Sequence, residues 1–317
     1  MELSKEQQFA FEKFKLGENL FMTGPGGTGK TQLIKHMVEY LIEQDNHKFQ
    51  VCALTGCAAI LLQCQAKTIH SWSGIGLGTG DVNDIVKRVA WNKYKSKVWH
   101  EIQTLIVDEV SMMSLKLFNI LDKIARIVKK VDEPFGGIQL VFSGDFYQLP
   151  PVGDEDEPDS CAFCFESPFW NETFPNSIEL IQIFRQTDEK YTKILNQIRK
   201  GVITKSSYEC LIELTKKTST DPLIKPTILN PTRRAVEYIN NKEMGLLPEE
   251  IKTFTAELSV NLPITKGQEG KRARYTEDEK TYELNYLMNN IMCDKVIHLK
   301  KGSQVLCIAN LEMEGRY

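Results

Sequence analysis

Long hydrophobic runs are missing from this sequence of 317 residues. No stretch of about 18 apolar residues occurs, so we expect no transmembrane helix and no membrane partner. The first residues, MELSKEQQ, have neither the apolar centre of a secretory signal nor the Arg-rich character of a transit peptide. These absences argue against a secreted or membrane protein, and we expect an intracellular one.

A zinc-ligand set is also missing, although the chain has eight cysteines. Cys161 and Cys164 form the only close pair in the sequence, and neither a second pair nor a histidine lies at zinc spacing. A structural zinc ion normally takes four ligands, so this pair alone does not predict a metal site. The cysteines are typical of reduced, mostly buried thiols in a cytosolic or nuclear protein.

An excess of positive charge, which many nucleic-acid-binding proteins have, is absent. The 39 Lys and Arg residues stand against 42 Asp and Glu residues, for a formal net charge of −3. Nucleic-acid binding depends on a local basic groove, so this total neither supports nor excludes such a partner. Hydrophobic residues make up 42% of the chain, which is enough for a sizeable core, and the length indicates about two domains.

Short apolar runs alternate with helical stretches up to about residue 180. The runs have the length of strands and are bounded by Gly, acidic or small polar residues. They cover residues 20–23, 51–54, 105–107 and 140–142. Residues 31–44 and 115–130 have the apolar spacing of helices. This alternation predicts an α/β fold with a mostly parallel sheet that helices cover on both faces.

Residues 72–100 interrupt the alternation and indicate a small insertion. Basic and aromatic residues are interleaved there, namely Lys87, Arg88, Lys93, Lys95 and Lys97 with Trp91, Tyr94 and Trp99. The mixture suits single-stranded nucleic acid, whose bases stack on aromatic rings. A surface helix whose aromatic residues pack inward explains the pattern equally well. The acidic residues 154–159 are expected to form a solvated surface turn.

The segment Gly24-Pro-Gly-Gly-Thr-Gly-Lys30-Thr31 matches the phosphate-binding pattern G-x-x-x-x-G-K-[ST] in full, between a predicted strand and a predicted helix. Its glycines let backbone N–H groups turn toward phosphate oxygens, and the helix N-terminus adds positive partial charge. We expect Lys30 to reach the β- and γ-phosphates of ATP and the Thr31 hydroxyl to bind Mg²⁺. The expected ATP-binding residues are Gly24, Gly26, Gly27, Thr28, Gly29, Lys30 and Thr31.

Two carboxylates, Asp108 and Glu109, follow the apolar run 105–107. The carboxyl ends of strands form the edge of an open parallel sheet that binds ligands. We expect Asp108 to hold Mg²⁺ through water and Glu109 to act as general base toward the attacking water. An acidic pair after an apolar run is common. Beside a phosphate-binding loop, however, it indicates ATP hydrolysis rather than ATP binding alone.

Three segments lie in a characteristic order: the loop 24–31, Asp-Glu-Val-Ser-Met-Met at 108–113, and Gly-Asp-Phe-Tyr-Gln-Leu-Pro-Pro-Val at 144–152. Two more are Pro-Phe-Gly-Gly-Ile-Gln at 134–139 and Lys-Thr-Ile-His-Ser-Trp-Ser-Gly-Ile-Gly-Leu-Gly at 67–78. Together they resemble the motifs of the Pif-type helicases, in the 5′-to-3′ branch of helicase superfamily one. The likeness runs in order over nearly the whole chain.

The resemblance implies roles for three further residues. Gln7 matches the glutamine that reads adenine, and Gln148 matches the residue that senses the γ-phosphate. Arg185 matches an arginine finger at the start of the second motor domain. A cation at the γ-phosphate stabilises the charge of the transition state, which agrees with that role. The expected catalytic set is therefore Lys30, Glu109, Gln148 and Arg185.

The resemblance also implies contacts to single-stranded DNA. In the first motor domain they are expected from Thr55, Gly56, Thr68, His70 and Ser71, and in the second from Thr232 and Arg233. Small and hydroxyl-bearing residues suit contacts to phosphate, which carry no sequence code. His70 has a second interpretation as a buried core histidine whose ring nitrogens are satisfied.

The resemblance implies a RecA-like first domain over residues 1–180, with the insertion 72–100, and a partial second RecA-like domain over 181–317. Two motifs that superfamily-one helicases carry further downstream are not found. One couples DNA to ATP, and the other supplies a second arginine finger. We therefore expect a piece of a longer protein, which by itself is poorly active, with a naturally short binding module as the alternative.

The second half of the sequence has its own expected elements. An α/β unit is expected to start near Ile178 and to lead into a helix at 234–242. Residues 266–280, rich in Lys, Arg, Glu and Asp, are typical of a linker. The β pattern at 302–309 resembles the first strand of an SH3-like insertion, expected near 296–317.

The sequence thus predicts an ATP- and Mg²⁺-dependent DNA helicase that moves 5′ to 3′ on single-stranded DNA, in DNA replication, repair or genome maintenance. Expected partners are single-stranded DNA and forked or structured DNA, bound by a monomer. By the resemblance it acts in the nucleus or mitochondrion, or in the cytoplasm if its source is viral or prokaryotic. The alternatives are a module that clamps ATP or single-stranded DNA without hydrolysis, and a P-loop kinase, whose acceptor site the sequence does not reveal.

Overall fold

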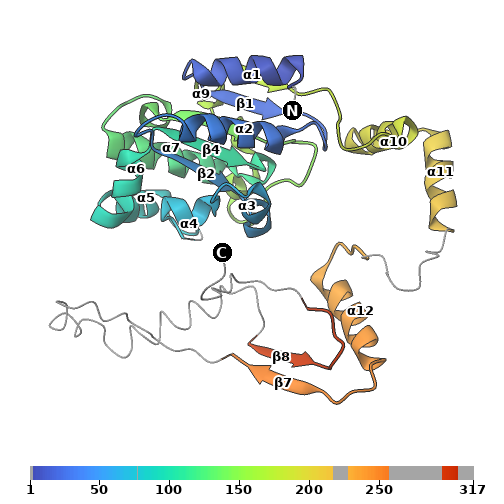
Figure 1. The fold of residues 1–317 in the computed structure, drawn as a ribbon. Helices are drawn as coiled ribbons and strands as arrows, with labels where there is room; N and C mark the ends of the chain where they lie inside the picture. Colours follow the sequence, from blue (N-terminus) through green and yellow to red (C-terminus); the bar gives the residue numbers. More distant parts are fainter. Residues whose placement is uncertain (1–2, 77, 217–227, 257–294, 306–317) are drawn as a thin grey trace. The chain divides into compact units, whose positions relative to one another are not determined.

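The computed structural model describes residues 3–76, 78–216, 228–256 and 295–305. The chain divides into two compact units, Met1–Lys217 and Thr218–Tyr317 (Figure 1). The predicted linker 266–280 lies outside the described residues, and so does the end of the predicted strand, 306–309. The domain division at residues 180 and 181 stays a prediction.

A six-stranded parallel sheet forms the centre of the first unit, with the strand order β3-β2-β4-β5-β1-β6. Its strands are β1 (Leu20–Thr23), β2 (Phe49–Ala53), β3 (Lys67–Thr68), β4 (Thr104–Asp108), β5 (Gln139–Ser143) and β6 (Asn176–Glu179). The four apolar runs of the sequence are β1, β2, β4 and β5, and they occupy the four inner positions. The predicted α/β class with a parallel sheet is confirmed.

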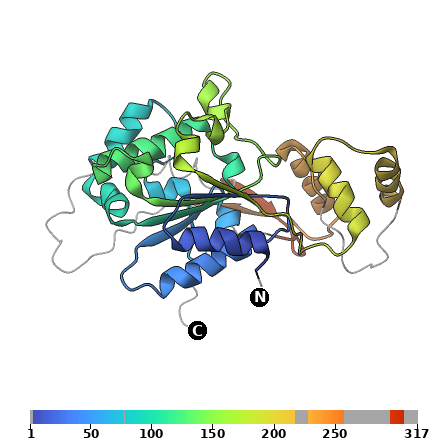
Figure 2. The ribbon, with the colours of Figure 1, turned by 90° about the horizontal axis from the view of Figure 1, so that it is seen from above.

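One face of the sheet is covered by α1 (Lys5–Lys15), α2 (Lys30–Ile42) and α3 (Gly56–Leu62). Alternate strand residues, among them Leu20, Met22 and Ile106, pack on these helices. Their neighbours Phe21, Leu105 and Val107 point to the opposite core. This period of two gives each face of a parallel strand its own core. Figure 2 shows the blue helices α1 and α2 on one side of the sheet and green helices on the other.

The second face is covered by α7 (Leu115–Lys129), the short helix α9 (Trp170–Thr173) and the 3₁₀ turn η2 (Pro134–Gly137). Helix α7 begins at its N-cap Ser114, whose hydroxyl accepts from the Leu117 N–H. An aromatic cluster that includes Phe118, Phe142 and Trp170 fills the space between α7 and the sheet. The predicted helices 31–44 and 115–130 are α2 and α7.

The described part of the insertion 72–100 holds the end of α4 (Ile69–Ser73), α5 (Val82–Ala90) and most of α6 (Lys93–Glu101), and these helices join the core of the second face. Trp99 is fully buried, its ring centroid is 4.7 Å from that of Trp72, and its Nε1–H donates to Ser73 O. Trp91 and Tyr94 are 77% and 86% exposed. The inward-packing interpretation therefore holds for Trp99 but is wrong for Trp91 and Tyr94.

The acidic loop 154–159 is mostly exposed, as expected for a surface turn, and leads into α8 (Pro158–Cys161). One of its residues departs from that expectation. Glu157 accepts a hydrogen bond of 2.6 Å from Nζ of Lys116 on α7, and Lys116 is buried. The loop is thus fixed to the helix by an ion pair. The first unit also contains the 3₁₀ turns η1 (Val110–Met112) and η3 (Cys164–Glu166).

Ile178 lies in β6, which pairs with β1, so it belongs to the first sheet and does not open a second α/β unit. After β6 the first unit continues through α10 (Glu189–Arg199) and α11 (Lys205–Thr215). No helix in the described part of either unit is long and apolar enough to cross a membrane.

The second unit contains α12 (Arg233–Gly245), which confirms the helix predicted at 234–242, and the antiparallel strands β7 (Lys252–Thr255) and β8 (Val296–Leu299). The predicted strand 302–309 is wrong over its described part, 302–305. Strand β8 ends at Leu299, and the chain then turns: Ser303 N–H donates to Lys300 O, and Gly302 has a φ of 94°.

Candidate nucleotide-binding site

The phosphate-binding loop joins the carboxyl end of β1 to the first turn of α2. Gly29 is the N-cap of α2 with a φ of 83°, in the left-handed region that glycine adopts without strain. A β-carbon at Gly29 would lie 2.6 Å from Nε2 of Gln7. With glycine as its cap, α2 has no capping side chain, so the first N–H groups of the helix remain available to an anion.

Lys30 lies over this loop, and its ammonium donates to Gly24 O at 2.7 Å and to Pro25 O at 3.1 Å. Burial lowers the pKa of Lys30, while the nearby carboxylates of Asp145 and Asp108 act in the opposite direction. A phosphate in the loop would offer the ammonium a charged acceptor in place of two neutral carbonyl oxygens, which is the stronger interaction.

Asp108 and Thr31 meet at the carboxyl end of β4. The Thr31 hydroxyl donates to Asp108 Oδ2 at 3.3 Å, and the Glu109 N–H donates to Asp108 Oδ1 at 3.0 Å. Burial raises the pKa of Asp108, and the hydrogen bond from the Glu109 N–H and the charge of Lys30 offset this only in part. A hydroxyl and a buried carboxylate that lacks full charge compensation form a hard oxygen-donor pair, which fits Mg²⁺.

Glu109 has a φ of 58° and a ψ of 39°, a left-handed conformation that is uncommon for residues other than glycine. Non-glycine residues held in this region cluster at functional sites, where the surrounding structure maintains the strain. Burial, and after it the charge of Asp108, raises the pKa of Glu109. A carboxylate with a raised pKa is a better proton acceptor, as a general base requires.

Gln148 follows β5, whose carboxyl end lies at the same sheet edge. Its side chain is exposed, and Nε2 donates to Asp145 Oδ2 at 3.3 Å. Asp145 is 1% exposed, and its backbone oxygen accepts from the Gln148 N–H at 2.8 Å. The carboxylate thus ties the side chain of Gln148 to the strand end.

Gln7 lies in the first turn of α1 and is buried against the phosphate-binding loop. Its Nε2 donates to Thr28 O at 3.2 Å, and its Oε1 accepts from the Ser4 N–H at 2.9 Å as part of a capping box. Its predicted contact to adenine stays a prediction.

Arg185 lies beside the phosphate-binding loop, within the first unit, and its side chain is exposed. The Phe184 N–H donates to Gly27 O at 2.8 Å. A β-carbon on Gly27, where φ is 85°, would lie 2.7 Å from Cβ of Arg185. Gly27 is therefore required by the close approach of residues 184 and 185 as well as by the turn.

The predicted DNA-binding threonines all start helices. Oγ1 of Thr55 accepts from the Ala58 N–H at 3.2 Å and caps α3, and Oγ1 of Thr68 accepts from the Ser71 N–H at 3.3 Å and caps α4. In the second unit Thr232 caps α12, whose first residue is Arg233. Each threonine therefore has a local structural role. Gly56 and Ser71 are exposed in the first turns of α3 and α4.

His70 is half-buried in α4, and burial lowers its pKa, so the imidazole is held in its uncharged form near neutral pH. The ring is only half-buried, and its nitrogens take part in none of the hydrogen bonds of the described residues, so the interpretation of His70 as a satisfied core histidine is not supported.

Two residues of this site, Asp145 and Arg199, were not among the site residues that the sequence indicated. Arg199, the last residue of α10, donates from Nε to Asp145 Oδ2 at 2.8 Å and from Nη2 to Asp145 Oδ1 at 2.9 Å. The paired residues are 54 positions apart in the sequence. Arg199 resembles any basic residue in the last turn of a helix, so the sequence offered no signal for this contact.

A model of PIF1-like helicases matches residues 2–209 of the chain. The chain belongs to the PIF1-like helicase family. It is 38% identical over 313 residues to a protein named ATP-dependent DNA helicase PIF1 from Saccharomyces cerevisiae, with 98% of this chain and 34% of that protein covered. The chain spans about a third of the length of the curated relatives it matches first.

Solved structures of PIF1-like helicases share the fold. The crystal structure of Pif1 helicase from Candida albicans is 33% identical with a TM-score of 0.79, and the match covers 98% of this chain and 66% of that one. Pif1 helicase from Bacteroides in complex with ADP-AlF3 and ssDNA is 27% identical with a TM-score of 0.68, covering 100% of this chain and 68% of that one. The first unit is thus a RecA-like domain of this family.

Proposed function

We propose that this chain is the ATP-hydrolysing part of a DNA helicase that moves 5′ to 3′ along single-stranded DNA. The observation that carries the proposal is the convergence of Lys30, Thr31, Asp108, Glu109 and Gln148 at one edge of one sheet, on three separate segments of the chain. The relatives' names and the Bacteroides complex with ADP-AlF3 and single-stranded DNA support it.

ATP binding falls to the loop and the first turn of α2. The N–H groups of residues 24–31 enclose the phosphates, and Lys30 leaves the carbonyl oxygens of the loop for the β- and γ-phosphates. Thr31 and Asp108 would hold Mg²⁺, which when bound neutralises charge on the phosphates. Gln7 borders the loop on the α1 side, where it would contact adenine.

Hydrolysis requires a proton acceptor beside the γ-phosphate. The left-handed backbone of Glu109 brings its carboxylate to the strand end next to Asp108, and burial raises its basicity. Glu109 takes a proton from the attacking water, and Gln148 senses the γ-phosphate. Arg185, already adjacent to Gly27, would stabilise charge on the transferred phosphoryl group.

DNA binding is assigned to the starts of α3 and α4 in the first unit and of α12 in the second. In α3 and α4, the threonine caps are accompanied by the small exposed residues Gly56 and Ser71, which leave backbone N–H groups near the surface and suit contacts to phosphate without sequence preference. We expect single-stranded and forked DNA as partners of a monomer that acts inside the cell, in the nucleus or mitochondrion, or in the cytoplasm if its source is viral or prokaryotic.

The test is ATP hydrolysis measured in a single turnover, with protein in excess over ATP, with and without oligo-dT. With protein in excess, slow hydrolysis is also detected, which is needed for a chain that spans about a third of the length of its relatives. We expect a rate that oligo-dT increases. Stable ATP binding with no hydrolysis in either condition would contradict the proposal and favour the non-hydrolysing clamp.

Direction and unwinding need a second measurement, on forks that carry only a 5′ tail or only a 3′ tail. We expect any unwinding to require the 5′ tail. Unwinding that depends on the 3′ tail would refute the assigned direction and leave the ATPase assignment untouched.

A further inference from the structure

Asp145 and Arg199 form a buried ion pair at the carboxyl end of β5. The guanidinium binds both carboxylate oxygens, at 2.8 and 2.9 Å, and the side chains of Arg199 and Asp145 are 13% and 1% exposed. The same guanidinium lies over the ring of Tyr147, 4.5 Å from its centroid. Two-pronged arginine–carboxylate pairs fix geometry as well as charge.

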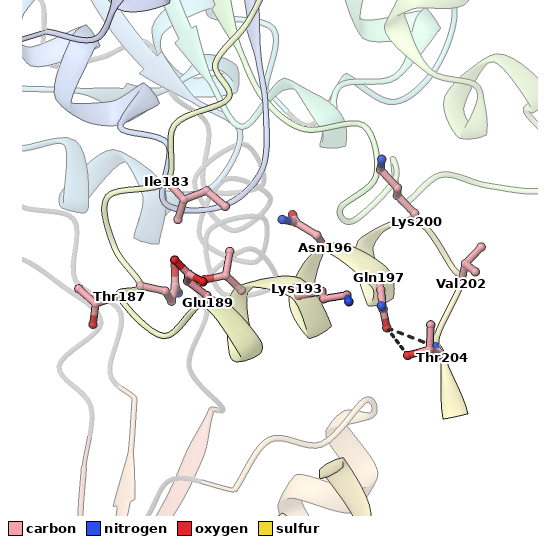
Figure 3. A pocket seen from close by; sticks show the side chains of 11 residues that line it. Ile183, Thr187, Glu189, Lys193, Asn196, Gln197, Lys200, Val202 and Thr204 are labelled. Atoms are coloured by element: carbon pink, nitrogen blue, oxygen red, sulfur yellow. Dashed lines mark hydrogen bonds between the residues drawn. The ribbon is translucent and has the colours of Figure 1, made fainter. Parts of the chain in front are cut away.

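Helix α10 ends at Arg199, and the chain then turns at Gly201. Gly201 has a φ of 68°, its N–H donates to Ile198 O, and the Val202 N–H donates to Gln197 O. These two bonds are the Schellman ending of a helix. Side chains of α10 such as Lys193 and Asn196 instead line an open pocket of about 830 Å³ (Figure 3). Arg199 is therefore set apart from them by its contact to the sheet.

We propose that Arg199 is a positioning residue for γ-phosphate sensing: it holds the Asp145 carboxylate, and through it the side chain of Gln148, at the end of β5. This inference rests on the proposed function, because it takes Gln148 as the residue that meets the γ-phosphate.

The hydrogen bonds of Asp145 connect Arg199 to Gln148, so Arg199 can influence the position of the Gln148 side chain. Asp145 Oδ1 also accepts from the Tyr147 N–H at 3.2 Å, and Oδ2 accepts from Gln148 Nε2 at 3.3 Å. Gln148 is otherwise exposed, so this bond restricts a side chain with several free torsions. One N–H of its amide is used, which leaves the second N–H and the carbonyl oxygen free to face a ligand.

The charges at the sheet edge give a second reason. The carboxyl groups of Asp108, Glu109 and Asp145 lie there, with the cations Lys30 and Arg199 close to them. Arg199 neutralises Asp145 directly, because the two groups are paired in a buried site where charge interactions are weakly screened. Without Arg199, the Asp145 carboxylate would lose the partner that fixes it, and Gln148 would lose a fixed acceptor for its side chain.

The experiment compares equilibrium binding of ADP and of AMP-PNP, both with Mg²⁺, to the full chain. The wild type should prefer AMP-PNP, which has a γ-phosphate. In Arg199→Gln that preference should fall roughly tenfold, which corresponds to loss of about one hydrogen bond to a charged group, while ADP affinity changes little. Lys193→Gln, which removes a positive charge from the same helix on the pocket side, should leave the preference unchanged.

A mutant cycle separates positioning from a general loss of structure. If Arg199 acts through Gln148, Arg199→Gln should lower the preference for AMP-PNP over ADP in the wild-type background. In the Gln148→Ala background the same substitution should not change that preference further. Arg199→Lys keeps the charge but not the two-pronged geometry and should give an intermediate preference. This variant also serves if Arg199→Gln does not fold.

The possible results distinguish failure of the proposed function from failure of the role of Arg199. A wild type that binds neither nucleotide refutes the proposed function itself. Equal affinity of the wild type for ADP and AMP-PNP removes γ-phosphate sensing and overturns this inference. A wild-type preference that persists in Arg199→Gln and Arg199→Lys, or that Arg199→Gln lowers further in the Gln148→Ala background, overturns the role of Arg199 while the ATP site stands.

Discussion

The nucleotide site and the DNA-binding candidates of the first unit differ in how their side chains are used. At the nucleotide site, Lys30 contacts the phosphate-binding loop, and its neighbour Thr31 contacts Asp108, which lies 77 positions away in the sequence. The side chains of Thr55 and Thr68 contact only the first turns of the helices that they cap, in the described hydrogen bonds. Convergence of distant residues is hard to explain without a ligand, whereas a threonine cap is fully explained by the helix that it starts.

Within the nucleotide site, substitution of Glu109 is expected to have the largest effect. Glu109→Gln keeps the shape of the side chain but removes the proton acceptor, so hydrolysis should fall by about 10²–10⁴-fold with ATP affinity retained. Single-turnover hydrolysis measures the rate, and titration with a fluorescent ATP analogue measures the affinity. Glu172→Gln, an exposed glutamate on α9, is the matched control. Hydrolysis at the wild-type rate would show that Glu109 is not the base.

Lys30→Ala should weaken MgATP binding by about a hundredfold or more, because several charge-assisted contacts to phosphate disappear. Lys35→Ala is the control on the same helix, since Lys35 is bonded to Gln63 away from the loop. Both affinities come from the same fluorescent titration. If the two variants bind equally well, Lys30 does not contact phosphate and the loop assignment is wrong.

Thr55→Asp tests whether Thr55 contacts DNA in addition to capping α3. Aspartate is as good an N-cap as threonine, so the free energy of unfolding should change little, whereas an added negative charge should lower single-stranded DNA affinity several-fold if phosphate lies there. Thr204→Asp, at the cap of α11, carries the same change on another helix of the first unit. Fluorescence anisotropy with oligo-dT at two salt concentrations measures the DNA affinity of both variants. Equal affinity of both variants would leave Thr55 with a capping role only.

The smallest expected effect is a pH dependence of stability that Asp145 contributes. Burial acts to raise the pKa of Asp145, but the hydrogen bonds from Arg199, Tyr147 and Gln148 together with the charge of Arg199 outweigh it and lower that pKa below its ordinary value of 3.8. A lowered carboxyl pKa stabilises the fold above pH 3.8, and this stabilisation is lost as pH falls through the lowered pKa. Urea unfolding should therefore show a steeper loss below that pH in the wild type than in Asp145→Asn. Parallel curves would contradict the ion pair.

The sequence was sufficient for the parts of the fold with local signals. The inner strands are continuous apolar runs, as in sheets that are buried on both faces, and the glycine-rich loop has a fixed spacing. The edge strands β3 and β6 were not predicted as parts of this sheet. β3 has only two residues, and most of β6, Asn-Ser-Ile-Glu, is not buried, so neither has the apolar signature.

Features that depend on helical phase or on distant contacts could not be predicted. Trp91 and Trp99 look alike in the sequence, but packing buries one and exposes the other. Nothing in the residues around Arg199 indicates that it reaches Asp145. The left-handed backbone of Glu109 is likewise set by its surroundings, because glutamate has no intrinsic preference for it.

The central claim is that this sheet edge binds ATP together with Mg²⁺. Calorimetric titration of ATP into the wild-type chain, once with Mg²⁺ and once with EDTA, tests it most directly. The account predicts one nucleotide bound per chain, with affinity that falls clearly when the metal is removed, because Thr31 and Asp108 then face the triphosphate without a cation between them. No binding with Mg²⁺ present, or equal affinity in both conditions, would contradict it.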